Sequence, residues 1–521
     1  MKINLLVPII VLAFLVRVVG INFGLPLELH PDEGKIIYPA NSMSVNFVES
    51  LQGRGDNAFF NPHIFYYGGV NFFILTSTIK LVSFVGRNFS VFNLVSLSPI
   101  FLLARFITVL FATATVYFVY RLGRDSFGEK VGLLSALVLA FFPTHVINSH
   151  YFSPDIIATF FGVASIYFLS RRKLLASSIM VGLGIGTKYY PAILAVFLGL
   201  GILIFLKGSL KSRLTKLLKY TVCAIVVFII TNPHVILNFP EFALDIKNQF
   251  ARNGGGILGS VSPRFFYLLV NNDSSSMGRF LGNSLFFDLG PLALLVVFIA
   301  VFYPWFHKNA FAKYLSGFVI CYFCFVSASI SKEMRWLMFE IPMIAILVGY
   351  FFSSLKSKKT ALVIGFLFLL FPIYKSVTVS LSFAKGDTRP TIVTWVEENI
   401  PQSSTILSDP ILVARSPFDD EKYQVFEVPH AKYNVNEAYE NESTPNLDII
   451  PKPLYVVTSS KFIDYYNSSD FRALFPTASQ KWIDYYKSIE SFTKQIKCIR
   501  TNEDGLINFT GPDICIYLME R

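Results

Sequence analysis

Apolar segments long enough to cross a membrane recur along the first three quarters of this chain of 521 residues. A helix needs about 20 predominantly apolar residues to cross a hydrocarbon core of about 30 Å, and lipid-exposed irregular backbone is not stable there. Hydrophobic residues make up 53% of the chain and charged residues 15%, a balance typical of a polytopic α-helical membrane protein. Eleven segments fit spanning helices, some of them short: 4–20, 101–120, 131–149, 155–170, 174–186, 191–205, 217–235, 284–303, 314–330, 336–350 and 361–374.

The positive charges of the loops predict how these segments are oriented. Lys and Arg are retained on the cytoplasmic side of a membrane, and here most of them fall in alternate short loops. The N-terminus is therefore expected inside and the C-terminal region outside. The net charge of +11 then reflects topology rather than nucleic-acid binding.

One further segment, residues 66–86, is nearly apolar enough to cross. Its Tyr, Asn, Thr, Ser and Lys side chains favour an interfacial amphipathic helix instead, inside a first external loop of residues 21–98. If this segment crossed the membrane, Asp32 would lie on the cytoplasmic face and could not meet Asp155.

The composition changes after Lys375, where Asp, Glu, Asn and Ser become frequent. We therefore expect a transmembrane module of residues 1–375 and a soluble extracytoplasmic α/β domain of residues 376–521. Its expected elements are a helix over 390–399 and strands over 405–407, 423–428, 454–458, 495–499 and 514–518. Cys498 and Cys515 of this domain could form a disulfide or stay free, and sequence does not decide between the two.

Ionisable residues near the expected outer ends of the spans carry the candidate chemistry, because a charge near lipid is costly and usually has a use. The carboxylates are Asp32 and Glu33 after the first span, and Asp155 between the third and fourth. Five cations are expected near the same face: Arg17, Arg105, Lys188, Lys332 and Arg335. Carboxylates that activate a hydroxyl, beside cations that hold a phosphate, are the minimum equipment for glycosyl transfer from a phospholipid carrier.

The order of short motifs resembles the GT-C glycosyltransferases of the protein O-mannosyltransferase and aminoarabinose transferase type, glycosyltransferase family 39. The resemblance covers nearly the whole chain. It rests on His30-Pro31-Asp32-Glu33, Asn61-Pro62-His63, Ala104-Arg105-Phe106, Ser153-Pro154-Asp155, Thr187-Lys188-Tyr189, Arg335-Trp336 followed by Pro342, and Thr388-Arg389 with Trp395, Asn399, Ile400 and Pro401.

This resemblance implies an inverting transfer from a polyprenyl-phosphate sugar to a hydroxyl or amine on a protein, lipid or glycan. Asp32 would be the general base. Glu33 would orient the acceptor or the base, or alternatively cap a loop helix.

Asp155, with His150 and Tyr189, would contact the donor sugar, although Asp155 also suits a helix N-cap. Lys188 and Arg335, with Arg105 and Arg17, would bind the lipid phosphate, and snorkelling to the interface is the alternative. A divalent Mg or Mn ion held by Asp32 and Asp155 is a further option, as some relatives use a metal and others do not.

Two other classes of protein stay open. A transporter or lipid flippase would also have many spans and intramembrane charges, but it more often shows inverted repeats and a midplane site. A noncatalytic scaffold of the same fold would tolerate Asp32→Asn in an activity assay. The resemblance favours a plasma-membrane enzyme with its site and C-terminal domain outside the cytoplasm.

Overall fold

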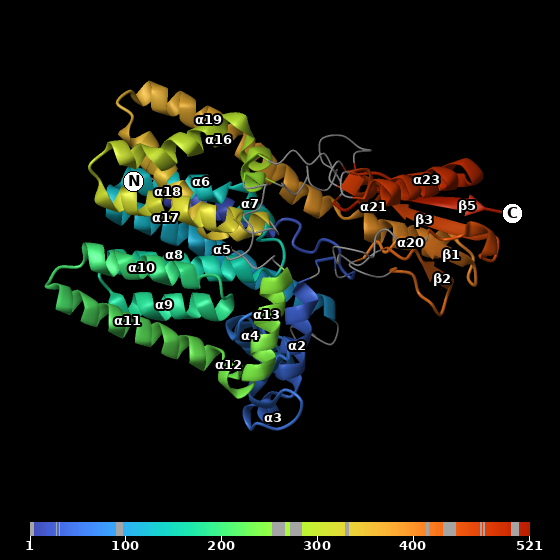
Figure 1. Ribbon diagram of the computed structural model, residues 1–521, viewed down its shortest axis with the longest axis horizontal. Coiled ribbons are helices and arrows are strands. Elements are labelled where there is room, and N and C mark those ends of the chain that lie inside the picture. The colour runs from blue at the N-terminus through green and yellow to red at the C-terminus, as the bar shows by residue number, and fades with distance from the viewer. Residues whose placement is uncertain are drawn as a thin grey trace. The chain divides into compact units, whose positions relative to one another are not determined.

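The computed structural model describes residues 5–27, 29–30, 32–89, 97–252, 266–270, 284–328, 333–412, 416–430, 444–468, 471–472, 475–501 and 510–520. Figure 1 shows its helices and strands. The chain divides into two compact units. The first, which runs to Ser380, is helical; the second holds the sheet and also includes residues 22–30. The break lies close to the boundary at 375 expected from composition.

The helices of the first unit follow the apolar pattern of the sequence. From the N-terminus to Thr187 they are α1 (Leu6–Val18), α2 (Glu33–Val45), α3 (Phe47–Leu51), η1 (Ala58–Phe60), α4 (Gly69–Phe89), α5 (Leu97–Phe127), α6 (Glu129–Ala140), α7 (Pro143–Ile147), α8 (Pro154–Ser170) and α9 (Leu174–Thr187). After Thr187 come α10 (Ala192–Phe205), α11 (Leu210–Thr231), α12 (His234–Leu237), α13 (Phe239–Arg252), α14 (Tyr267–Val270), α16 (Leu285–Phe302), η3 (Tyr303–Phe306), α17 (Ala310–Ser327), η4 (Met334–Phe339), α18 (Ile341–Ser354) and α19 (Lys358–Lys385), which continues past the boundary between the units.

Each of the eleven expected spans contains a helix. Among the described residues, six helices are long and apolar enough to cross a membrane, and five more apolar helices are shorter. The expected span 131–149 is divided into α6 and α7, because Pro143 lacks the backbone N–H that a continuous helix requires. The expected span 336–350 begins with the 3-10 turn η4, and α18 starts just before Pro342.

The segment expected at the interface forms one of the six long apolar helices, since Gly69–Gly86 of α4 has the length and hydropathy of a span. The length and hydropathy of α4 are therefore those of a membrane span and not those of the interfacial helix that we expected. In Figure 1, α4 lies with α2, α3, α12 and α13 at one end of the bundle that contains α5, α8, α9, α10 and α11. This position agrees with a helix that covers the end of a bundle.

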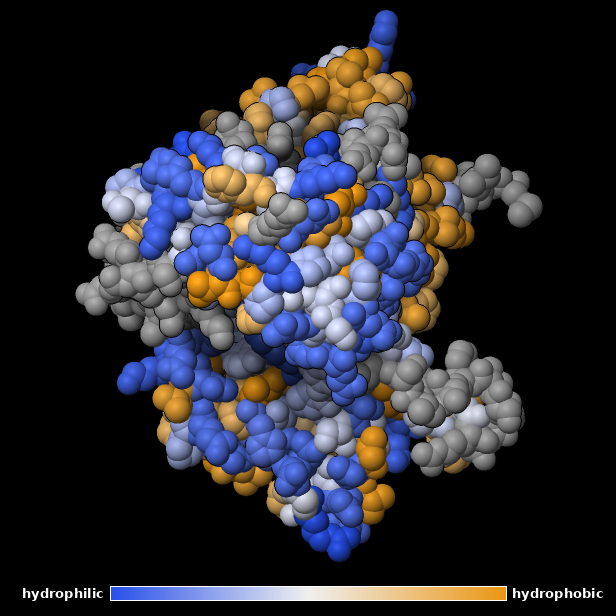
Figure 2. Space-filling model, turned by 90° about the vertical axis from the view of Figure 1, so that its right-hand side faces the viewer, coloured by the Kyte–Doolittle hydropathy of each residue, from blue (hydrophilic) through white to orange (hydrophobic). Residues whose placement is uncertain are grey.

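Close helix packing builds the core of the first unit. Helix α5 packs against α6 and α8, and α18 packs against α6. Gly132 of α6 approaches α5 so closely that a Cβ atom there would lie 2.7 Å from the carbonyl oxygen of Tyr120, as is common where small residues join membrane helices. Large hydrophobic residues are instead exposed along α11 and α19, as lipid contact would require. The face shown in Figure 2 is mostly hydrophilic, with hydrophobic side chains in separate patches.

The second unit is a small α/β domain around a five-stranded mixed sheet. Its strands, in the order β2-β1-β3-β5-β4, are β1 (Thr405–Ser408), β2 (Gln424–Glu427), β3 (Leu454–Ser459), β4 (Lys494–Ile499) and β5 (Ile514–Met519). β1 runs parallel to β2 and β3, whereas β5 is antiparallel to β3 and β4. All five strands coincide with expected ones. Its helices are α20 (Thr388–Asn399), which was expected, and α21 (Ser460–Asn467) and α23 (Pro476–Phe492), which were not, together with the 3-10 turn η5 (Leu447–Ile449).

A disulfide joins Cys498 and Cys515, which lie opposite each other on β4 and β5. Replacing both residues by Ser is expected to lower the free energy of unfolding of this domain by about 2–4 kcal/mol, because the bond closes a loop between residues 17 positions apart. Thermal unfolding with and without reductant measures this. Reductant should lower the unfolding temperature of the wild type and leave the double variant unchanged, and equal unfolding temperatures for both proteins would contradict the expectation.

Candidate active site

Asp32 and Arg335, 303 positions apart in sequence, form an ion pair in the first unit. Asp32 is the N-cap residue of α2, but its side chain makes no capping hydrogen bond. The Nη1 of Arg335, in η4, donates to Oδ2 of Asp32 at 2.5 Å. Lys35, one turn along α2, places its Nζ 3.9 Å from Oδ1 of Asp32. The carboxylate predicted to act as the base therefore lies between two cations.

Asp155 forms the second half of the cluster. Pro154 and Asp155 begin α8, as Pro favours the first position of a helix. The Nζ of Lys188, just after α9, lies 2.8 Å from each carboxylate oxygen of Asp155. The hydroxyl of Tyr190 donates to Oδ1 of the same group. Because Asp155 is only 1% exposed, these contacts hold Lys188 in a fixed position.

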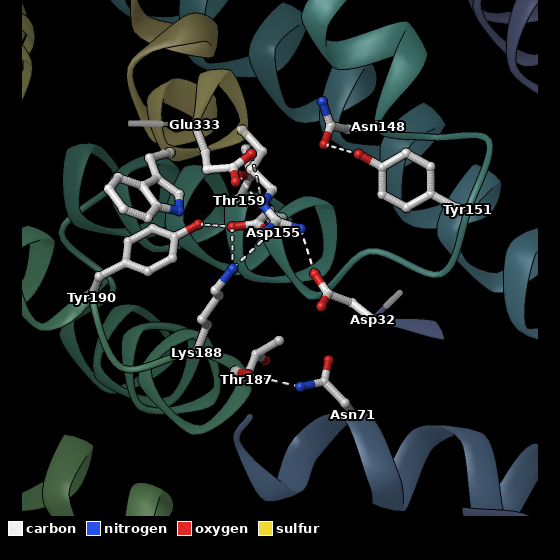
Figure 3. A network of polar contacts seen from close by, with 12 residues as sticks. Asp32, Asn71, Asn148, Tyr151, Asp155, Thr159, Thr187, Lys188, Tyr190 and Glu333 are labelled. Atoms are coloured by element: carbon white, nitrogen blue, oxygen red, sulfur yellow. Dashed lines mark hydrogen bonds and ion pairs between the residues drawn. The ribbon is translucent and has the colours of Figure 1, made fainter. Parts of the chain in front are cut away.

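Electrostatics join the two halves into one site. Burial by itself would lower the pKa of Arg335, but the carboxylates of Asp155, Asp32 and Glu333 raise it overall. Burial lowers the pKa of Lys188, and Asp155 partly opposes this effect. Asp32, Asp155, Lys188 and Arg335 therefore belong to one partly buried cluster of opposite charges, and Figure 3 labels the first three of these residues. Asp32 and Asp155 thus lie near the same arginine, as we expected if the first loop and the Asp155 segment are on one face.

Glu33 and Arg105 lie together, but in a fully buried pair. Nε and Nη2 of Arg105 each donate at 2.8 Å to one carboxylate oxygen of Glu33, and both side chains are 0% exposed. Glu33 also accepts the backbone N–H of Phe152 at 2.8 Å, and Arg105 donates to the carbonyl of Ile21. This placement differs from the expectation that Arg105 binds the lipid phosphate, because its guanidinium is engaged by Glu33 and Ile21.

Arg17 and His150 are also placed away from the expected ligands. Arg17 is buried in α1 and donates to the carbonyls of Ala13, Leu139 and Ala140, while its Nη2 lies 3.0 Å from Nδ1 of His145. The ring nitrogens of His150 lie 2.9 and 3.0 Å from the carbonyl oxygens of Val146 and Val19. Burial lowers the pKa of His150 to about 4. Both side chains tie α1 to neighbouring segments.

Tyr190 contacts Asp155, whereas Tyr189 contacts other aromatic side chains. The Tyr189 ring packs edge to face against Phe228 and Phe242. Tyr189 also lines a small pocket. Tyr67 and other residues of the loop before α4 line the same pocket, together with residues of the turn between α11 and α12. Tyr189 was the predicted sugar ligand, but Tyr190 is the tyrosine that contacts the cluster.

The donor atoms of the cluster do not fit a divalent metal ion. Among the described residues, no group of three or more His, Cys, Asp or Glu side chains is arranged so that it could hold a metal ion. Asp32 and Asp155 are each already paired with a cation, and a Mg²⁺ site needs oxygen ligands without competing positive charges. The two carboxylates suit the binding of Arg335 and Lys188 better than that of a metal.

Besides Tyr190, the residues Lys35, Asn71 and Tyr151 lie near the cluster and were not among the predicted site residues. Lys35 lies beside Asp32, and Asn71 of α4 donates to Thr187, the residue before Lys188. Tyr151 donates to Asn148, and burial raises the pKa of its hydroxyl. Tyr151 lies between the predicted site residues His150 and Asp155, so its position in the sequence could have indicated it. Nothing in the sequence distinguishes Asn71 from other polar residues of its segment.

Comparison with known proteins finds a family match over part of the chain and solved structures of similar fold. Residues 97–237 match the family model described as dolichyl-phosphate-mannose-protein mannosyltransferase. The structure is similar to that of ArnT from Cupriavidus metallidurans bound to undecaprenyl phosphate, with a TM-score of 0.51 and 15% identity over 99% of this chain and 98% of that one. The apo structure of the same protein gives a TM-score of 0.50 and 15% identity over 98% and 97% of the two chains. No curated protein matches this chain by sequence.

The likeness to these structures shows a shared fold, and the six long apolar helices fit a multi-pass membrane protein. Over residues 97–237, the family match agrees with the resemblance noted from the motifs.

Proposed function

We propose that this protein transfers a sugar, with inversion, from a polyprenyl-phosphate donor to a hydroxyl or amine of an acceptor outside the cytoplasm. The observation that carries the proposal is the single cluster in which Asp32, Arg335, Lys188 and Asp155 meet. This cluster contains a candidate general base, Asp32, and two cations, Arg335 and Lys188, that can stabilise a leaving phosphate.

Asp32 takes the proton of the acceptor group as its oxygen or nitrogen attacks the anomeric carbon. The bond from that carbon to the phosphate oxygen breaks, and its electron pair stays on the phosphate. Lys188 and Arg335 stabilise the added negative charge, which they do more strongly in a buried site than in water. Asp155 acts on Lys188, whose ammonium it holds through both carboxylate oxygens, and through this contact it positions the phosphate site.

The position of the cluster supports an outer-face reaction. The loop charges predict that the segments bearing Asp32, Asp155, Lys188 and Arg335 all open on the side opposite the Lys- and Arg-rich loops. The disulfide of the second unit suits an oxidising compartment. A prokaryotic plasma membrane is the location we propose. The acceptor is a protein, lipid or glycan in that compartment.

The test incubates the purified protein with a panel of radiolabelled polyprenyl-phosphate sugars and follows the release of polyprenyl phosphate, with and without candidate acceptors. Arg335→Gln is expected to lower turnover of the active donor about 10²- to 10³-fold, because one charge that stabilises the leaving group is removed. Arg335→Lys should recover part of the activity. Lys211→Gln, which alters an exposed lysine of α11, is the matched control.

The same assay can overturn the proposal. If the wild type consumes no donor, or if Arg335→Gln and Lys211→Gln are equally active, the cluster does not carry this reaction. A transporter or flippase would instead move a fluorescent polyprenyl phosphate across vesicles without cleaving the sugar bond.

A further inference from the structure

Asn71 lies beside the cluster, and the hydrogen bonding of its side-chain oxygen is incomplete among the described residues. The residue lies at the start of α4 and is 0% exposed. Its Nδ2 donates to the carbonyl oxygens of Thr187 at 2.7 Å and Gly68 at 3.0 Å. Its Oδ1 is buried and has no hydrogen-bond partner among the residues that the structure describes. A buried amide oxygen without a partner is costly and needs an explanation.

The orientation of this amide is determined by its neighbours. Both atoms that face the amide nitrogen are carbonyl oxygens, which only accept hydrogen bonds. An inverted amide would place Oδ1 against both of them and lose two hydrogen bonds. Oδ1 of Asn71 must therefore turn away from Gly68 and Thr187. In Figure 3 it points toward the side of the cluster on which Lys188 and Asp32 lie.

The backbone around Asn71 is rigid, so the direction of Oδ1 is well determined. The N–H of Gly68 donates to the carbonyl of Thr187 at 3.0 Å. Any Cβ on Gly68 would lie 2.0 Å from the carbonyl oxygen of Gly186, so the two segments are in direct backbone contact. The N–H of Gly69 also donates to Oδ1 of Asn232 at 2.6 Å. Asn71 and Lys188 are thus held in a constant relation to each other.

We propose that Oδ1 of Asn71 accepts a hydrogen bond from a hydroxyl or amino group of the sugar being transferred. This inference rests on the proposed function and deepens it, because the sugar must lie between the base Asp32 and the phosphate held at Lys188. Asn71 is then a specificity-determining residue. It requires a hydrogen-bond donor at one position of the sugar, since an acceptor group there would face the Asn71 oxygen.

The experiment combines a protein variant with altered donors. Asn71→Ala and the wild type are compared on the active polyprenyl-phosphate sugar and on its monodeoxy analogues. At one position, removal of the sugar group is expected to lower kcat/KM of the wild type about tenfold or more. Asn71→Ala should show the same loss on the complete sugar and no additional loss on that analogue. A residue that only supports the fold would slow all donors by one common factor.

A second variant separates the hydrogen bonds that Asn71 donates to Gly68 and Thr187 from its proposed contact with the sugar. Asn71→Asp retains an acceptor atom but adds a negative charge near the phosphate site, so its preference for the complete sugar over the analogue is measured rather than its rate. If this folded variant prefers the complete sugar no more than Asn71→Ala does, the retained oxygen makes no sugar contact and the proposal is overturned. A common slowing factor for Asn71→Ala on all analogues would overturn it as well. If the wild type consumes no donor at all, the proposed function itself fails and the inference fails with it.

Discussion

Asp32→Asn is expected to lower donor turnover about 10²- to 10⁴-fold, the range that a general base contributes. The amide keeps the size of the carboxylate but cannot take the proton of the acceptor. It also removes the charge that contacts Arg335 at 2.5 Å. Release of polyprenyl phosphate from the active donor, with and without acceptor, measures the effect. The rate of slow hydrolysis should fall together with the rate of transfer.

A matched variant tests whether the effect belongs to Asp32. Asp125→Asn also removes a carboxylate that contacts arginines, here Arg124 and Arg171, but outside the cluster. It should leave turnover within about twofold of the wild type, because it changes no residue of the cluster. Unchanged turnover in Asp32→Asn would refute the proposed mechanism and favour a noncatalytic scaffold of the same fold.

Arg105→Met is expected to destabilise the first unit by about 3–5 kcal/mol, because it leaves the buried carboxylate of Glu33 without its partner. Both side chains are 0% exposed, and their bidentate contact joins α2 to α5. Glu33 also holds the N–H of Phe152 in the segment that leads to Asp155. Loss of activity should therefore accompany loss of stability. Thermal unfolding in one detergent measures the change.

Two further variants make this result specific. Arg171→Gln removes an arginine whose side chain is 52% exposed, so its unfolding temperature should stay near that of the wild type. The double variant Glu33→Leu with Arg105→Met should be more stable than Arg105→Met alone, since no uncompensated charge is left. If Arg105→Met unfolds at the wild-type temperature and binds the donor less well, Arg105 is a phosphate ligand, as the motifs had indicated.

The sequence predicted the helices and strands of this protein more completely than it predicted the roles of its charged residues. Apolar runs indicated the helices because membrane crossing imposes length and hydropathy. Alternating apolar residues likewise indicated all five strands. The four residues Asp32, Asp155, Lys188 and Arg335 were identified from charge in an apolar context, and the structure brings them together.

The charged residues whose placement differed from expectation show what sequence alone could not provide. Arg17 and Arg105 have the same chemistry as Arg335, and all three lie near the ends of apolar segments. Only packing determines that Arg17 meets carbonyl groups, that Arg105 meets Glu33, and that Arg335 meets Asp32.

The sequence by itself thus determined that the chain is a polytopic membrane protein with an added α/β domain, and which charges could serve in a reaction. The tertiary structure decided which of these charges face one another. The reason is physical: hydropathy and strand pattern are local properties of a segment, whereas an ion pair depends on contacts between residues hundreds of positions apart. Asn71 is the clearest case, because the orientation of its amide follows from two carbonyl groups that only the fold places beside it.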